Sequence, residues 1–548
     1  MVNTHGTHLS QELIQNVAQK LQHRGPDNLG LYQDKNVLML HTRLRINGDM
    51  SSQPLTNNDN TIHLIINGEI FNWKELSNEL NYTCTKSDCE VIIPLYQKYK
   101  HDIGGMLRRL EGQFSFVLYD TEINYVLIAR DRIGITPLYI GKDGGVVIAS
   151  ELKCLEVCGS GSVDVFNPRT YIYGDVSKIA TLQGVKFHSF DDHITTAVYD
   201  PSDRPHILAN IRNYLKASVK SQLEDLLIDG AANFGVLLSG GLDSSLIASL
   251  VVGLCKELGF NKQVKTFSIG VHKDVPDLVA ARRVAKYLGT DHHEFYFETS
   301  EGVDAIPQVI WHIESYDCTS VRASTAMYLL TKKIKEKFND TKVLFSGELS
   351  DELLCYLYGA NAPSEEAFQN ETIALVSNVH LFDCLRANKT CMAHSMEARV
   401  PFTDSKFVDY ILGLHPKWKC FGSNGVKGAM EKQILRDAFV GWLPDDILYR
   451  KKEQFSDGVS GFNGPKDNLI DALKHYCTTL YSKQTFENEC TKYPFNKPTS
   501  HETLYYRSVF DKHFGHIPNS EFTVKTWQPK WCANSDPSGR VQSFWEIN

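Results

Sequence analysis

The sequence lacks the features that would place it in a membrane or on nucleic acid. No apolar run approaches the roughly 20 residues that a membrane-spanning helix needs. Acidic residues outnumber basic ones by 65 to 57, so the formal net charge of −8 offers no general attraction for a polyanion. The start, Met1–His8, has no basic segment followed by an apolar core, as a secretory signal would. We therefore expect a cytoplasmic protein that binds neither nucleic acid nor a membrane.

A disulfide framework is also missing. The 13 cysteines are odd in number, and no two of them form a Cys-x-x-Cys pair, which is typical of reduced thiols. Cys154 and Cys158 could share a helix face, but no histidine or cysteine partner lies nearby. We interpret these two as packing residues rather than metal ligands.

The glycine-containing segment Gly235–Ser245 is neither a Walker loop nor a dinucleotide fingerprint, because it lacks Gly-Lys-Ser/Thr and three spaced glycines. It is an apolar run followed by Ser239, Gly240 and Gly241 and then by a hydroxyl-rich helical pattern. Glycines let the backbone approach a ligand, and the N–H groups of a helix start attract anions. Asp243 would repel phosphate unless a magnesium ion lay between them. The segment predicts a pyrophosphate and Mg²⁺ site, with an ordinary strand-to-helix turn as the alternative.

The chain of 548 residues is too long for a single core, and its patterns change along its length. Residues 1–195 contain short runs rich in Val, Ile, Tyr and Phe, which predict an α+β sandwich of antiparallel sheets. A polar linker follows at Tyr199–Pro205. Over residues 206–515 strands alternate with helices, which predicts a doubly wound parallel sheet with ligands at the carboxyl ends of its strands. Residues 516–548 form a polar tail, expected to be partly disordered.

An acidic cluster follows one strand of the second region. Glu348, Asp351 and Glu352 lie within five residues, directly after Ser346 and Gly347 end an apolar run. Such a density of negative charge requires cations or ligands to balance it. A solvated acidic turn is the alternative, and a buried strand end argues against it.

Basic residues follow in two further segments. Lys451 and Lys452 precede a glycine-bearing turn, where an ammonium could neutralise phosphate oxygens, although a lysine pair is far more often a solvated face. Asp383, Arg386 and Lys389 are spaced to share one helix face. That face could hold an anionic substrate or simply form intrahelical salt bridges.

Taken together, these segments resemble glutamine-hydrolysing asparagine synthetase, the bacterial B type and its eukaryotic relatives. The resemblance extends from about residue 20 to 515, and Asp536–Arg540 also resembles the bacterial tail. Motifs in this order are hard to obtain by chance. They are Ser239–Ser245, Arg322–Thr325, Ser346–Glu348 with Ser350–Glu352, Asp383–Lys389, Glu397–Pro401 and Lys452–Gly458.

The resemblance implies an ATP pyrophosphatase-type domain that converts aspartate, ATP and an amino donor to asparagine, AMP and pyrophosphate through β-aspartyl-AMP. The donor is glutamine or ammonia. By resemblance Glu348 assists the attack of ammonia as a base, Lys452 binds ATP phosphate, and Asp243 and Asp351 share Mg²⁺. ATP is expected to contact Leu237, Leu238, Ser239, Gly240, Gly241, Asp243, Ser244, Ile269, Ser346 and Gly347, and the substrate Arg322, Asp383, Arg386, Lys389 and Glu397.

The first region resembles a class II amidotransferase domain, of the Ntn-hydrolase type. By this resemblance Arg43 holds the glutamine carboxylate and Asp88 its α-amino group, while Asn67 and Gly68 form an oxyanion hole beside Glu69. These roles suit the groups, because a guanidinium grips a carboxylate with two hydrogen bonds and N–H donors stabilise a tetrahedral oxyanion. A homodimer is compatible with the family. The motifs are His23–Asp27, Arg43–Leu44, Asn67–Asn72, Ser87–Glu90, Glu111–Phe114 and Arg130–Gly134.

The sequence departs from the family at its start. The family's nucleophile is a cysteine exposed at the N-terminus, whose own amino group acts as the base, whereas this sequence has Val2. The motif at Arg24 also begins several residues early. We therefore expect the first strand to be absent and glutamine hydrolysis to fail. A truncated or mis-started gene model, a synthetase that uses free ammonia, and a glutaminase domain kept as scaffold all remain open.

The acidic loop departs as well. Leu349 replaces a glycine, and the Gly-Gly after Glu352 is missing, which leaves Leu353–Tyr356. Since leucine adopts a positive φ less easily than glycine, we expect the loop around Glu348 to sit differently. A catalytically impaired paralogue with a structural or interaction role is the main alternative. A β-lactam synthetase is less favoured, because the substrate-side segments follow the asparagine pattern.

Overall fold

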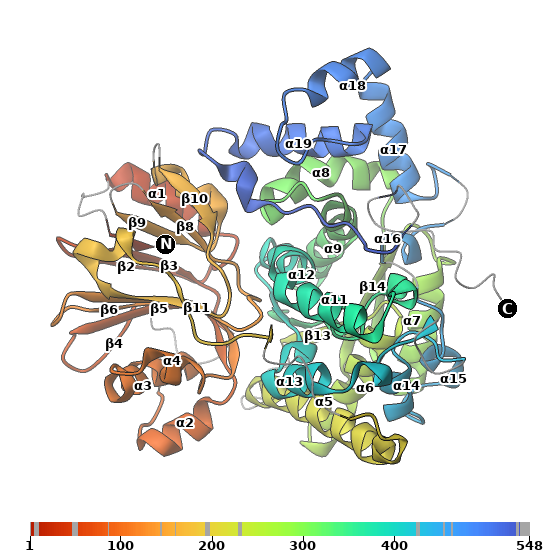
Figure 1. Cartoon of the computed structure of the whole chain (residues 1–548), viewed down its shortest axis with the longest axis horizontal. Helices are drawn as coiled ribbons and strands as arrows, with labels where there is room; N and C mark the ends of the chain where they lie inside the picture. Colours follow the sequence, from red (N-terminus) through yellow and green to blue (C-terminus); the bar gives the residue numbers. More distant parts are fainter. Residues whose placement is uncertain are drawn as a thin grey trace. The chain divides into compact units, whose positions relative to one another are not determined.

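The computed structural model describes residues 2–4, 10–46, 53–85, 87–142, 145–158, 161–191, 198–227, 233–422, 428–452, 455–461, 464–532 and 536 (Figure 1). Glu453 and Gln454 of one family motif, and 537–540 of the tail motif, lie outside them. The chain divides into two compact units. The first comprises Met1–Ser189, Met392–Met396 and Asp511–Val524, and the second Phe190–Cys391, Glu397–Phe510 and Lys525–Asn548.

The first unit is built from two six-stranded sheets whose pairs are antiparallel, as the short strand patterns predict. One sheet has the order β10-β8-β9-β1-β3-β2 and the other β12-β11-β7-β6-β5-β4. The strands are β1 (Val2–Asn3), β2 (Asn28–Gln33), β3 (Leu38–Arg43), β4 (Leu55–Thr56), β5 (Ile62–Ile70), β6 (Gly112–Asp120), β7 (Tyr125–Arg130), β8 (Tyr139–Lys142), β9 (Val146–Ala149), β10 (Ser162–Val165), β11 (Thr170–Asp175) and β12 (Val185–Lys186).

Alternation along the strands creates two cores in this unit. Val117 and Tyr119 of β6 contribute to a cluster shared with Met39 and Ile148 of the other sheet. Their neighbours Phe116 and Leu118 face a second cluster. This second core is covered by α2 (Trp73–Leu80), α3 (Ile92–Tyr99) and α4 (Ile103–Leu107), while α1 (Gln11–Leu21) contacts β3. Because successive side chains of a strand point to opposite faces, one buried sheet serves both cores.

The expected absence of a first strand is wrong. Val2 and Asn3 form β1, in which Val2 pairs with Met39 of β3 on one side and with Ile148 of β9 on the other. The Val2 side chain is buried in the core between the sheets. A two-residue strand is too short for an alternating pattern to be visible in the sequence.

The second unit contains a parallel five-stranded sheet with the order β15-β14-β13-β16-β17, which confirms the predicted doubly wound class. The strands are β13 (Phe234–Leu237), β14 (Lys265–Gly270), β15 (Asp291–Tyr296), β16 (Val343–Phe345) and β17 (Glu397–Arg399), of which the patterns predict all except β17. The chain adds strands outward from β13 on one side and then returns to place β16 on the other. The loops after β13 and β16 therefore meet at a topological switch point, where ligands of such sheets bind.

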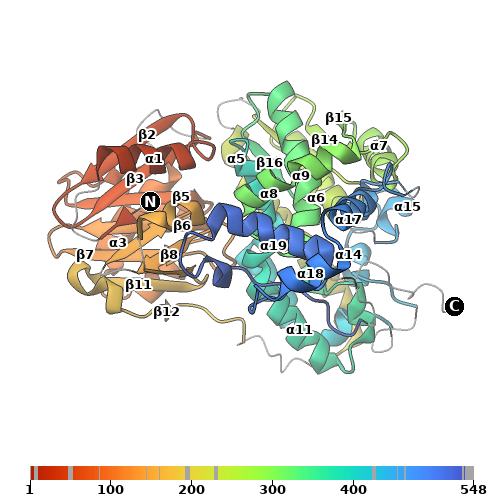
Figure 2. The ribbon, with the colours of Figure 1, turned by 90° about the horizontal axis from the view of Figure 1, so that it is seen from above.

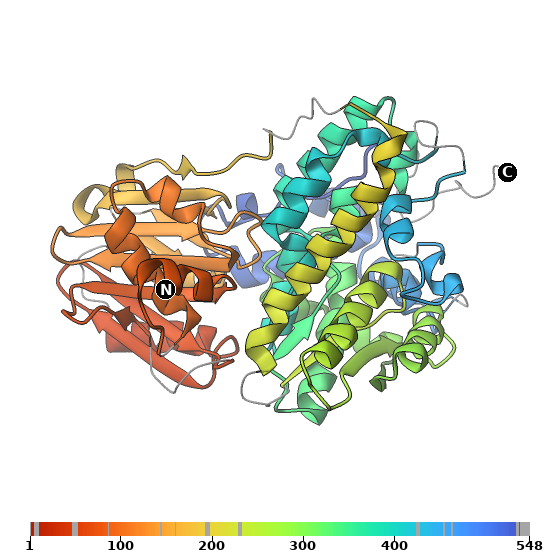
Figure 3. The ribbon, with the colours of Figure 1, turned by 90° about the horizontal axis from the view of Figure 1, so that it is seen from below.

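Helices surround this sheet. In Figure 3 the long α5, coloured yellow to yellow-green, runs beside α13, and Figure 2 shows α17, α18 and α19 together. No helix in the described part of the chain is long and apolar enough to cross a membrane. The helices are α5 (Arg204–Leu227), α6 (Leu242–Glu257), α7 (Pro276–Leu288), α8 (Thr299–Ile313), α9 (Cys318–Lys337), α10 (Ser350–Leu354), α11 (Glu365–Asn378), α12 (Asp383–Met392), α13 (Ser405–Gly413), α14 (Gln433–Ala438), α15 (Asp445–Leu448), α16 (Phe455–Gly458), α17 (Leu469–Leu480), α18 (Lys483–Cys490) and α19 (His501–Phe514).

Two glycines of the second unit differ in whether their surroundings leave room for a side chain. Gly240 has φ +73°, and a Cβ there would lie 2.4 Å from the Ala281 backbone nitrogen. We expect Gly240→Ala to lower the free energy of unfolding by at least about 2 kcal/mol, measured by chemical denaturation. Gly253→Ala is the matched control, because nothing lies within 4 Å of its Cβ position in α6. It should be neutral or stabilising by up to about 1 kcal/mol, and an equal loss in both variants would contradict the argument.

Candidate active site

The glycine loop connects β13 to α6 and is held by its own hydroxyls. The Ser239 backbone N–H donates to Ser244 Oγ at 3.2 Å, and the Gly241 N–H donates to Ser239 Oγ at 3.3 Å. Ser244 Oγ in turn donates to the Gly241 carbonyl at 3.2 Å. Gly347, after β16, lies so close to the start of α6 that a Cβ would come within 2.9 Å of the Ser244 nitrogen. The loops at the switch point therefore touch.

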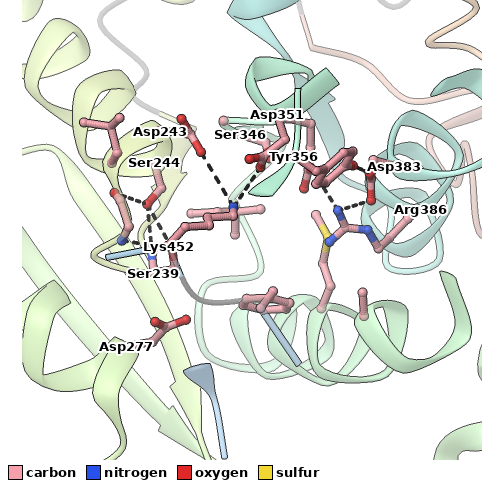
Figure 4. Close-up of a pocket in the computed structure, with 18 of the residues that line it drawn as sticks. Ser239, Asp243, Ser244, Asp277, Ser346, Asp351, Tyr356, Asp383, Arg386 and Lys452 are labelled. Carbon is pink, nitrogen blue, oxygen red and sulfur yellow. Dashed lines mark hydrogen bonds and ion pairs between the residues drawn. The ribbon is translucent and has the colours of Figure 1, made fainter. Parts of the chain in front are cut away.

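A cavity of about 220 Å³ opens at these loops in the second unit (Figure 4). Its lining comes from the ends of β13, β14 and β16 and from α9, α12 and the segment before α14. Gly240, Lys389 and Glu397 do not line it, although the sequence patterns group them with residues that do. The sequence-predicted residues that line it are Leu237, Leu238, Ser239, Gly241, Asp243, Ser244, Ile269, Arg322, Ser346, Gly347, Glu348, Asp351, Asp383, Arg386 and Lys452.

Two lysines face two aspartates at one side of the cavity. Lys432 Nζ lies 2.6 Å from Asp243 Oδ2 and 2.7 Å from Asp351 Oδ1, and Lys452 Nζ lies 2.7 Å from Asp351 Oδ2. Burial opposes ionisation of Asp351, but the two ammonium groups outweigh it and hold its pKa below the usual value. Lys432 is almost fully buried and has φ +57°. The sequence patterns did not indicate Lys432, since a single lysine before a short helix carries no signal.

At two positions the acidic loop has a positive φ, which glycine adopts easily, although neither residue is a glycine. Leu349 has φ +76° and Cys355 has φ +63°. Both side chains are buried, and each costs roughly 1–3 kcal/mol of backbone strain that the surroundings must balance. Leu349 thus holds a left-handed turn under strain, and the expectation that the loop sits differently from the family's stays a prediction.

A chain of hydrogen-bonded groups starts at Glu348. Arg386 Nη2 donates to Glu348 Oε2 at 2.8 Å and to Asp383 Oδ1 at 2.5 Å. Burial raises the pKa of Glu348 to about 7, although Arg386 acts in the opposite direction. Burial also favours neutral Asp383, but Arg386 and its other hydrogen bonds lower the pKa of that carboxyl below its usual value. Glu348 is thus the carboxyl of this pair whose pKa lies near neutrality.

The chain continues to Tyr356, whose hydroxyl lies 2.6 Å from Asp383 Oδ2 and 2.7 Å from Glu352 Oε1. A phenol has one hydrogen, so it can donate to only one of these carboxyls. Burial and the charge of Asp383 raise the pKa of Glu352 well above its usual value. The neutral form of Glu352 is therefore favoured, and Tyr356, Glu352 and Asp383 form one hydrogen-bonded cluster.

Arg322 lines the cavity with a guanidinium that is already engaged. Its Nε and Nη2 donate to the two carboxylate oxygens of Glu502 at 2.8 and 2.6 Å, and its Nη1 donates to Asp536 at 2.8 Å. Thr319, one turn earlier on α9, also lines the cavity, and no sequence pattern indicates it. A lone hydroxyl residue in a helix gives no sequence signal.

Lys389 and Glu397 form ion pairs elsewhere in the second unit. The Lys389 ammonium pairs with Glu314, and both side chains are fully buried. Glu397 Oε1 accepts from Arg399 Nε at 2.9 Å on β17. These pairs suit a structural role, so the assignment of both residues as substrate contacts stays a prediction.

In the first unit the residues assigned to glutamine lie around β5. Asn67, Gly68 and Glu69 are on β5, and the Ile70 N–H donates to Asp88 Oδ2 at 2.7 Å. Gly68 has φ +139°, and a Cβ there would lie 1.9 Å from the Gln113 carbonyl oxygen, so only glycine fits. Arg43 ends β3, on which His41 Nε2 contacts the Ile66 carbonyl at 3.1 Å. Contacts between β3 and β5 therefore place the strand that ends at Arg43 against the strand that carries Asn67, Gly68 and Glu69.

A glycine loop at the switch point of a parallel sheet, with lysines and carboxylates converging on it, defines a nucleotide-dependent enzyme domain. Comparison with known proteins agrees. Residues 2–177 match the glutamine amidotransferase domain family, and residues 210–365 and 356–533 match the asparagine synthase family.

Curated relatives match along nearly the whole chain. The glutamine-hydrolysing asparagine synthetase 2 of Lotus japonicus is 40% identical over 555 residues, which cover 96% of this chain and 89% of that protein. A probable asparagine synthetase of Dictyostelium discoideum is 39% identical over 554 residues, with 96% and 94% covered. Synthetase 2 of Arabidopsis thaliana is 40% identical over 558 residues, with 96% and 90% covered. This chain belongs to the glutamine-hydrolysing asparagine synthetase family.

The buried Lys432 should hold the two loops together. We expect Lys432→Met to lower the free energy of unfolding by about 3 kcal/mol in chemical denaturation, because it removes the buried ammonium that pairs with both Asp243 and Asp351. Lys256→Met, at an exposed position in the last turn of α6, is the control and should change it by less than about 0.5 kcal/mol. A loss in the Lys432 variant no larger than in the control would show that the bridge contributes nothing.

Proposed function

We propose that this chain converts aspartate, ATP and an amino donor, glutamine or ammonia, to asparagine, AMP and pyrophosphate. The observation that carries the proposal is a set of unsatisfied polar atoms on residues that line the cavity. Asp243 Oδ1, Thr319 Oγ1 and Arg386 Nε are buried and have no hydrogen-bond partner among the described residues. Buried polar atoms of this kind are rare in a folded protein, and a bound ligand would satisfy them.

The first step would occur at the glycine loop. A β-carboxylate oxygen of aspartate attacks the α-phosphorus of ATP, the bond from that phosphorus to the bridging oxygen breaks, and pyrophosphate leaves with the electron pair. The first N–H groups of α6 have no side-chain cap, so they would bind the leaving pyrophosphate, with the Ser239 hydroxyl beside them. Lys432 and Lys452 can then compensate the charge that develops on it.

A magnesium ion fits the same place. Asp243 Oδ1 lacks a partner beside the loop, whereas both oxygens of Asp351 are paired with Lys432 and Lys452, so a bound ion would have to displace an ammonium group from Asp351. The described residues contain no group of three His, Cys, Asp or Glu side chains that could hold a metal alone. Two carboxylates together with phosphate oxygens and water are the ligands that Mg²⁺ usually takes. When bound, the ion would neutralise phosphate charge.

In the second step ammonia attacks the β-carbonyl carbon of β-aspartyl-AMP, and AMP leaves as the C–N bond forms. The attacking nitrogen must lose a proton. Glu348 lies in the cavity with a pKa near neutrality, so its carboxylate can accept that proton, and Arg386 orients it at 2.8 Å. A homodimer, and glutamine as the source of ammonia, stay part of the proposal.

The assay of both donors tests this function. Purified protein with ATP, Mg²⁺ and aspartate should release pyrophosphate and form asparagine in equal amounts when ammonia is added. Asparagine formed from glutamine would show that the amidotransferase unit works, and formation from ammonia alone would show a synthetase with an inactive first unit. The Asp351→Asn variant is the inactive reference. If neither product forms with either donor, the proposed enzyme function is overturned and a non-catalytic paralogue is favoured.

The raised pKa of Glu348 predicts a pH dependence. Because the carboxylate form is the base, kcat with ammonia, corrected for the fraction of unprotonated ammonia, should fall as pH drops through about 7. Glu348→Gln should reduce kcat by about 10²-fold or more and remove this limb, while Glu348→Asp should keep it at a lower rate. A wild-type rate that is flat from pH 6 to 8 would contradict Glu348 as the base.

A further inference from the structure

The segment Lys525–Cys532, which we call the C-terminal strap, contains no helix or strand and is held by contacts within the second unit. The Trp527 N–H donates to Asp317 Oδ1 at 2.7 Å, at the start of α9. Lys530 Nζ lies 2.5 Å from Glu371 Oε2 on α11. In Figure 1 the strap belongs to the dark-blue chain that follows α19. The strap is therefore fixed to two helices of the second unit.

Trp527 forms part of the active-site cavity. Its side chain lines the cavity, and its ring centre lies 5.6 Å from that of Tyr356 and 6.0 Å from that of Tyr358. Trp531, four residues later, contacts Tyr358 at 6.2 Å, and it does not line the cavity. The two tryptophans of one strap thus differ in what they touch.

The acidic loop needs outside support at this point. Leu349 and Cys355 have a left-handed backbone that their side chains disfavour, so the local sequence alone does not hold Tyr356 in place. The Tyr356 hydroxyl keeps Asp383 and Glu352 in their hydrogen-bonded arrangement, and Asp383 shares Arg386 with Glu348. Apolar packing around Tyr356 is therefore coupled to the position of the reacting carboxyl.

A second contact joins the same end of the chain to the cavity. Asp536 accepts from Arg322 Nη1 at 2.8 Å and lies 2.9 Å from Lys474 Nζ. Arg322 lines the cavity, and it lies on α9, whose N-cap residue Asp317 accepts the Trp527 N–H. The C-terminal region thus contacts the cavity lining at Tyr356 and at Arg322.

We propose that Trp527 is a positioning residue of the synthetase reaction. Its ring packs against Tyr356 and thereby holds the hydrogen-bonded side chains of Tyr356, Asp383, Arg386 and Glu348 in place. It also excludes water from the acyl-adenylate. This inference rests on the proposed function. An activated acyl group is hydrolysed when water reaches it, so a cavity wall protects the intermediate until ammonia attacks. Without this wall the intermediate would be hydrolysed, so pyrophosphate would be released while no asparagine is formed.

Three variants test this role: Trp527→Ala, Trp527→Phe and Trp531→Ala. With ammonia as donor, Trp527→Ala should lower kcat for asparagine at least about tenfold and raise the ratio of pyrophosphate to asparagine clearly above one. Trp527→Phe should have a kcat and a ratio of pyrophosphate to asparagine close to those of the wild type, because it restores an aromatic face. Trp531→Ala, in the same strap, should lower the unfolding temperature but keep the ratio near one. A rise in unfolding temperature with ATP and Mg²⁺ in each variant shows that it is folded.

The outcomes separate this inference from the function beneath it. Wild-type protein that releases no pyrophosphate overturns the proposed function, and this inference with it. With an active wild type, a Trp527→Ala variant that keeps the wild-type kcat and a ratio of one overturns the inference alone. A ratio raised equally by Trp531→Ala would also overturn it, because the strap would then act only through stability.

Discussion

The second unit depends on the charge balance between Asp243, Asp351, Lys432 and Lys452. These side chains come from the start of α6, from α10, from the residue before α14 and from the segment between α15 and α16, which are far apart in the sequence. Two carboxylates brought together inside a protein repel each other strongly unless cations lie between them. The lysines supply those cations here, and the same four groups then face the place where phosphate would bind. One cluster of four charged side chains therefore both stabilises this part of the second unit and faces the phosphate position.

The acidic loop shows how tertiary contacts can sustain a costly backbone. A glycine at position 349 or 355 would adopt the observed φ without strain, yet leucine and cysteine occupy these positions. Both side chains are buried, and Cys355 belongs to an apolar cluster that Tyr358, Trp527 and Trp531 also contact. The burial of apolar surface can offset strain of this size, at roughly 25 cal/mol per Å². Residues outside the loop thus decide whether Glu348 is held in place.

Part of the cavity lining could be expected from the sequence because it follows strands, whereas Arg322 was assigned only through the family resemblance. Ser239, Ser346 and Ile269 end parallel strands, and the edge to which such strands point is fixed once the sheet is parallel. Lys432, Thr319 and Trp527 were not visible, because each lies in a helix start or an irregular segment that no periodicity distinguishes. Lys389 and Glu397 were grouped with the site by their motifs, but they are paired with Glu314 and Arg399 away from the cavity.

The sequence by itself determined the two-part organisation, the class of each sheet, and the glycine loop between β13 and α6. These follow from local rules, since alternation and helical spacing report which face of an element is buried. Only the tertiary structure decided the partners of each charge, the near-neutral pKa of Glu348 and the strand at Val2. The reason is physical: pairing, burial and strand addition depend on groups distant in the chain, and no local pattern contains them.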